Sequence, residues 1–148
     1  MKAKIASILS AIFILFTAAC GSGDTQLAKA ERLLVHHPDS ALLILSQHAT
    51  DTPQSIILKA LAADLTDTPM PGDSLLSRAA SYYASGNDAK MQFLALYCTG
   101  RSYQLHNHDA KAMLQYTQAE HLIEDIDNAA YAALLYTRLA QLYSNARL

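Results

Sequence analysis

The sequence predicts an all-α chain of about seven helices, and three observations support this prediction. Apolar residues recur at the three- and four-residue spacing of a helix face, and no segment shows the apolar–polar alternation of a half-buried strand. Turn signals interrupt this pattern at regular intervals. Five glycines and four prolines in 148 residues are too few for a long flexible linker. The expected helices lie near residues 25–36, 40–48, 53–65, 74–85, 89–106, 109–123 and 128–146.

Capping residues set these boundaries. Asp, Ser, Thr and Asn side chains accept hydrogen bonds from the free N–H groups of a first turn, and proline suits the first helical position. Thr52 followed by Pro53 therefore predicts the start of the third helix. Gly86 and Asn107 tolerate the left-handed conformation that ends helices, so they predict the ends of the fourth and fifth helices. The remaining turn signals are residues 38–40 before the second helix, 71–73 before the fourth and 125–128 before the last.

The N-terminal residues have the composition of a signal peptide. Lys2 and Lys4 precede an uncharged, mostly apolar run over residues 5–19. A membrane-spanning helix needs about 20 apolar residues, so this run is short for a span and fits the apolar core of a signal peptide. We therefore expect residues 1–19 to form a signal peptide.

The end of this segment points to lipid attachment. It reads TAAC at residues 17–20 and continues with the polar sequence GSGD. Small residues before a cysteine resemble the lipobox of bacterial lipoproteins, with threonine where that family usually has leucine. The resemblance implies cleavage before Cys20, acylation of Cys20 with chains such as palmitate, and a lipid anchor in the cell envelope. Gly21, in place of an acidic residue, favours the outer membrane. An ordinary secretory peptide and a short anchor helix with an incidental cysteine are the alternatives.

The chain from Cys20 onward suits one acidic domain. It has 9 basic and 13 acidic residues, a net charge of −4 with neutral histidines, and no basic stripe, so nucleic acid is not an expected partner of this portion. We expect a tether over residues 20–24 and a helical domain over residues 25–148. Cys98 lies in an apolar helix and is expected to be a small packing residue.

Residues 93–126 contain a pattern of small and large apolar residues on two successive helices. Its members are Leu96, Gly100, Tyr103, Ala112, Tyr116 and Ala119. This spacing resembles the tetratricopeptide repeat (TPR) family, in which a small residue on the first helix lets the second helix approach. Tyr136, Ala140 and Tyr143 repeat the first half 40 residues later, which gives a partial repeat over residues 133–148.

The resemblance extends to a family of bacterial envelope repeat proteins. It rests on the sequence ERLLVHHPDSALLIL at residues 31–45 and on residues 74–103. It implies antiparallel helix pairs stacked as a right-handed solenoid that presents a surface to another protein. Some members of that family are lipoproteins, and others continue into a DNA-binding regulator.

In family members that bind peptides, the first helix of each pair lines a concave groove. The corresponding polar positions, which are our candidate partner-binding residues, are Tyr97, Arg101, Gln104, Thr137, Gln141 and Ser144. Leu94, Leu105, Leu134 and Asn145 accompany them. Arg101 suits a carboxylate of the partner, because its guanidinium can donate two parallel hydrogen bonds. The alternative is a merely solvated helix face.

Apolar residues surround most of the last predicted helix, 128–146. Tyr131, Leu135, Tyr136, Leu139 and Tyr143 point to different sides of it. Such a helix is expected to be covered on more than one side. We expect self-association, a docked partner, or a continuation of the chain beyond Leu148.

No sequence pattern predicts catalysis, a cofactor or a metal site. There is no glycine-rich phosphate loop after a strand and no nucleophile elbow. The six histidines include no pair spaced by four residues on one helix face. We therefore expect a binding protein and no enzyme: an envelope lipoprotein that acts as a protein-interaction scaffold. The alternative is the sensory front of a longer TPR-containing, membrane-associated transcriptional regulator.

Overall fold

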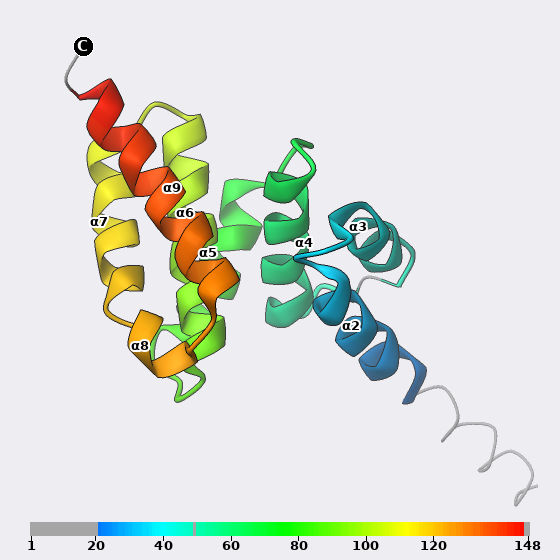
Figure 1. The fold of residues 1–148 in the computed structure, drawn as a ribbon. Coiled ribbons are helices and arrows are strands. Elements are labelled where there is room, and N and C mark those ends of the chain that lie inside the picture. Colours follow the sequence, from blue (N-terminus) through cyan, green and yellow to red (C-terminus); the bar gives the residue numbers. More distant parts are fainter. Residues whose placement is uncertain (1–20, 49, 147–148) are drawn as a thin grey trace, which may run out of the picture.

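A computed structural model of the chain describes residues 21–48 and 50–146 (Figure 1). This part of the chain is all-helical, as the sequence predicts, and successive helices pack against each other in antiparallel order. The eight helices of these described residues are α2 (Gly21–Leu33), α3 (Pro38–Gln47), α4 (Pro53–Leu65), α5 (Asp73–Tyr83), α6 (Ala89–Leu105), α7 (Asp109–Glu120), α8 (Ile123–Ile126) and α9 (Ala129–Asn145). The predicted signal peptide and Cys20 lie outside the described residues.

Three local details differ from the sequence prediction. Helix α2 begins at Gly21, so residues 21–24 of the expected tether are helical, and Asp24 lies in the first turn, where a negative charge stabilises a helix. Gly86 follows α5 without a positive φ, so the left-handed conformation predicted there was wrong. Residues 123–126, expected to end the sixth helix and begin a turn, form the separate short helix α8. Asp127 ends α8 in the left-handed conformation (φ 42°) and turns the chain into α9.

The predicted caps are present at several helix ends. Thr52 Oγ1 accepts a hydrogen bond from the Ser55 backbone N–H at 3.3 Å, and Pro53 opens α4. Asn128 caps α9 by accepting from two backbone N–H groups, each at 3.1 Å. Asn107 has φ 59°, which confirms the left-handed turn predicted between the two best-matched helices. Local sequence therefore accounts for these boundaries.

The TPR-like pattern forms a close helix contact, as predicted. A Cβ atom at Gly100 of α6 would lie 2.6 Å from the Tyr116 ring of α7, well inside van der Waals contact. Tyr116 is fully buried, and so are Ala112 and Ala119 on either side of it. The missing side chain at Gly100 therefore makes room for an aromatic ring at the α6–α7 interface.

Helices α2 and α3 lie at one end of the row of helices, and α6, α7, α8 and α9 lie together at the other (Figure 1). Helix α9 packs on α7, and its Tyr131 ring stacks on Phe93 of α6 with the ring centroids 5.8 Å apart. The opposite side of α9 remains open, with Tyr136 48% and Tyr143 59% exposed. Cys98 is fully buried as predicted, and burial raises the pKa of its thiol.

Candidate binding surface

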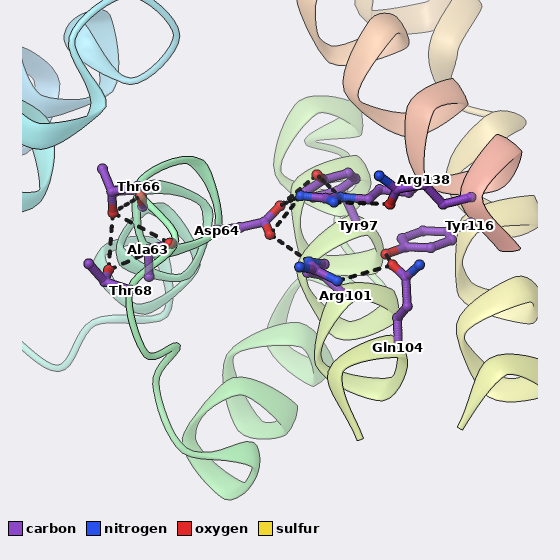
Figure 2. A network of polar contacts seen from close by, with 11 residues as sticks. Ala63, Asp64, Thr66, Thr68, Tyr97, Arg101, Gln104, Tyr116 and Arg138 are labelled. Carbon is purple, nitrogen blue, oxygen red and sulfur yellow. Dashed lines mark hydrogen bonds and ion pairs between the residues drawn. The ribbon is translucent and has the colours of Figure 1, made fainter. Parts of the chain in front are cut away.

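Asp64, near the end of α4, is the centre of a network of polar side chains (Figure 2). Its side chain is only 2% exposed. Arg101 of α6 donates from Nε to Oδ1 at 2.6 Å. Arg138 of α9 donates from Nη2 to both carboxylate oxygens, at 2.9 and 3.1 Å. One carboxylate thus joins three helices that are far apart in the sequence.

Tyr97 completes the ring of donors around this carboxylate. Its hydroxyl donates to Asp64 Oδ2 at 2.7 Å and accepts from Arg138 Nε at 3.3 Å. Burial, together with the charge of Asp64, raises the pKa of the Tyr97 hydroxyl well above its ordinary value. Burial also opposes the charge of Arg138, but the contacts with Tyr97 and Asp64 outweigh this effect and raise the pKa of Arg138. The tyrosine is therefore neutral and the arginine charged at physiological pH.

Two glutamines extend the network to the surface. Gln104 Oε1 accepts from Arg101 Nη1 at 3.3 Å and from the Tyr116 hydroxyl at 3.1 Å. Gln141 Oε1 accepts from Arg138 Nη1 at 3.1 Å. Two guanidinium groups share one carboxylate, so the cluster carries one excess positive charge. The Arg101 and Arg138 side chains are 15% and 18% exposed, which leaves part of this charge accessible from solvent.

An apolar groove borders Arg138. It has a volume of about 340 Å³ and lies between α9, the end of α4 and the residues after α2. Its lining residues are Val35, Leu65, Ala130, Ala133, Leu134, Thr137 and Arg138. Apolar side chains line most of its surface, and the guanidinium of Arg138 lies at one side. This combination suits an extended or helical segment with an apolar side chain next to a carboxylate.

The structure separates the predicted groove residues into two groups. Thr137 and Leu134 line the groove, and Gln141 and Ser144 are exposed farther along α9. Tyr97 and Leu94, by contrast, are fully buried and have no surface to offer a partner. Arg101 does contact a carboxylate, as its chemistry suggested, but this carboxylate is Asp64 of the same chain. Gln104 is held within the same network, and Leu105 and Asn145 are exposed away from the groove lining.

Sequence reasoning missed both Asp64 and Arg138. The signal for Asp64 is present in the sequence, because it is the only carboxylate in the apolar helix α4, directly after three buried alanine and leucine positions. A carboxylate at such a position needs a partner of opposite sign. The sequence does not show that the partners come from α6 and α9, because this depends on how the helices stack.

A second depression of about 460 Å³ lies between α5, α6 and α7. Small and amide side chains line it, among them Ala80, Ala95, Thr99 and Gln115, and none of its lining residues is charged. It lies apart from the Asp64 network. Only its shape, and no charged side chain, could make this depression selective for a ligand.

In the part of the chain that the structure describes, no group of three or more metal-ligating side chains occurs. All six histidines are exposed. The Nδ1 atom of His106 lies 3.9 Å from Asp73 Oδ2. Within residues 21–48 and 50–146, no helix combines the length and the apolar composition needed to cross a membrane.

The chain was compared with protein-family models, with curated proteins and with solved structures. None of these matches it. The family resemblance therefore rests on the residues and the helix packing described above.

Proposed function

We propose that this chain is a TPR-like lipoprotein of the bacterial envelope that acts as a scaffold by binding a segment of another protein. The support for a repeat fold is the order of its contacts. From α2 to α7 each helix packs on the next, and the first helices of successive pairs also contact each other, α2 on α4 and α4 on α6. This order is typical of a solenoid of helix pairs. The right-handed stacking of TPR proteins is part of the proposal.

The groove beside Arg138 is the observation that carries the proposed binding function. Its aliphatic lining takes up an apolar side chain. The excess positive charge of the Arg101–Arg138–Asp64 cluster favours a neighbouring carboxylate. The ligand that fits is a peptide segment in which an apolar residue adjoins an acidic residue.

Selection from a library of random short peptides tests this function. The unchanged chain should enrich peptides that carry an apolar residue next to an acidic one. Thr137→Trp places an indole in the groove, so the same peptides should be lost. Thr117→Trp is the matched control, because Thr117 is exposed on α7 and outside the groove, and it should retain them. No shared motif among the selected peptides, or equal binding by both tryptophan variants, would contradict the proposal.

The proposed lipid anchor needs a separate measurement. We expect the protein recovered from membranes of its host to have the mass of a chain that begins at Cys20 plus acyl chains. Cys20→Ser should abolish this mass and release the protein from the membrane. A mass that includes residues 1–19, or one without acyl chains, would contradict the lipoprotein assignment and leave the groove proposal intact.

A further inference from the structure

The open side of α9 carries a continuous apolar stripe. It consists of Ala129, Ala133, Tyr136, Ala140 and Tyr143, at alternating spacings of four and three residues, and is called the α9 stripe below. These positions form one face of a helix. Tyr136 and Tyr143 are among the most exposed large apolar side chains of the described chain. Arg138, the single charged residue of α9, belongs to the opposite side and is held by Asp64.

The same chain shows how a face of this kind is covered. Tyr136, Ala140 and Tyr143 lie 40 residues after Leu96, Gly100 and Tyr103 of α6. On α6 that face is covered by α7, whose Tyr116 ring sits directly over Gly100. The packing device is a tyrosine of one helix placed over a small residue of the next. The α9 stripe also combines tyrosines with small residues, but it has alanine where α6 has Gly100. Because a Cβ at Gly100 would lie 2.6 Å from the tyrosine ring, two α9 helices must pack farther apart than α6 and α7 do.

We propose that the α9 stripe pairs with the α9 stripe of a second copy of this chain in an antiparallel, two-fold symmetric dimer. A two-fold axis at the level of residue 138 brings Tyr136 of one copy over Ala140 of the other. The same axis brings Tyr143 over Ala133. Every tyrosine in these two pairs then meets an alanine. A two-fold interface requires such self-complementarity, since the same patch must serve both copies.

The distribution of charge allows a second copy on this stripe. None of its five residues is charged, so the two helices can approach without burying an unpaired charge. Glu120 and Glu124 lie beside Tyr136 around a depression at the edge of the stripe. They stay at the solvent-exposed rim of the dimer, where their mutual repulsion is screened beyond about 8 Å at physiological ionic strength.

The size of the contact predicts a weak dimer. A single helix pair buries less than about 1,200 Å² in total, which is the range of transient complexes. Two chains held on the same membrane surface would associate more readily, because confinement raises their effective concentration. The dimer does not need a ligand in the peptide groove, but the two surfaces share Ala133, which belongs to the stripe and lines the groove.

Disulfide cross-linking of two differently tagged full-length chains in one membrane tests the register. One chain carries Ala133→Cys and the other Tyr143→Cys. Oxidation should link them to each other, because the two-fold axis pairs these positions. Either variant alone should give no cross-link, since identical residues lie ten helical positions, or about 15 Å, apart along the axis. The unchanged chain controls for Cys20, and Cys98 is fully buried.

A charged substitution tests the stripe independently. Ala140→Glu in both chains places a carboxylate against Tyr136 of the other copy, and the yield of the cross-link between positions 133 and 143 should fall about tenfold or more. Thr117→Glu adds the same charge at an exposed position of α7 outside the stripe, and the yield should stay unchanged. Circular dichroism should show equal helicity for both, because each position is exposed and glutamate is a good helix former. Cross-linking of each cysteine variant with itself would show a parallel pair. The absence of any cross-link would show that the stripe is covered by something else or stays exposed. A parallel pair and the absence of a cross-link would each overturn the proposal.

Discussion

At the scale of the residue, Gly100 shows how one missing side chain determines a helix contact. Tyr116 fills the space above Gly100, and its hydroxyl reaches Gln104 on the same helix as the glycine. Because the ring is fully buried and bonded at its tip, it has little freedom to move aside. Burial is also the main cause of the raised pKa of the Tyr116 hydroxyl.

Gly100→Ala is expected to destabilise the fold. The added methyl group would lie 2.6 and 2.7 Å from two ring carbons, so the α6–α7 contact must open. Overpacking of this kind costs roughly 1–3 kcal/mol, which exceeds the gain of about 0.5–1 kcal/mol from replacing glycine by alanine in a helix. Urea unfolding followed by circular dichroism measures the net loss. Gly86→Ala is the control, because its nearest contact would be an ordinary 3.6 Å and it should change stability little. Equal stability of both variants would show that the ring moves freely.

At the scale of the element, the Asp64 network determines how three helices meet. The ion pairs connect the end of α4 to the C-terminal part of α6 and to the middle of α9. Within the described residues, Asp64 supplies the side-chain hydrogen bonds that join α4 to α9. A buried ion pair contributes little net stability when it forms, but removal of one partner leaves the others without compensation. The network therefore fixes the position of α9, and with it one wall of the groove.

Asp64→Ala should cost about 3 kcal/mol of folding stability, the lower end for a broken buried pair because both arginines retain some solvent contact. It leaves two guanidinium groups facing each other and the Tyr97 hydroxyl without its acceptor. Urea unfolding measures this loss, and Asp51→Ala, at an exposed loop residue, is the control. Combining Asp64→Ala with Arg138→Met should recover part of the loss, because it removes one of the two opposed charges. A cost equal to that of the control would mean that the network does not hold the helices together.

At the scale of the whole molecule, the core contains several groups that must stay protonated. Burial raises the pKa of Tyr97, Tyr116 and Cys98 above their ordinary values of 10.0, 10.0 and 9.0. The folded chain therefore holds these protons more tightly than the unfolded chain does. The stability that this difference contributes is fully present below the pKa values of the unfolded chain. It decreases as the pH rises above those values.

Folding stability should thus fall at alkaline pH, from about pH 9 for the thiol and from about pH 10 for the tyrosines. Each group that remains protonated only in the folded chain contributes a slope of about −1.4 kcal/mol per pH unit. Urea unfolding at a series of pH values measures this slope. Cys98→Ala should remove the component that begins near pH 9, and Tyr82→Phe, at an exposed tyrosine, should leave the slope of the parent chain. A stability that stays constant up to about pH 11 would contradict the role of these buried groups.

The sequence by itself determined the helices and one of their contacts. Helix starts and ends depend on local chemistry, so Thr52, Asn107 and Asn128 could be identified without a structure. The contact of Gly100 with Tyr116 was also predictable, because a short turn joins the two helices and leaves them antiparallel neighbours.

Only the tertiary structure decided which residues form the candidate site. Tyr97 and Arg101 have side chains suited to a ligand, but the stacking of α4 on α6 turns them toward Asp64 instead. The groove, in turn, is formed where α9 comes near the residues after α2, which lie about a hundred positions earlier. A helix pattern shows which side of each helix is apolar. It does not show which distant helix will meet that side, because this depends on the accumulated geometry of every helix between them.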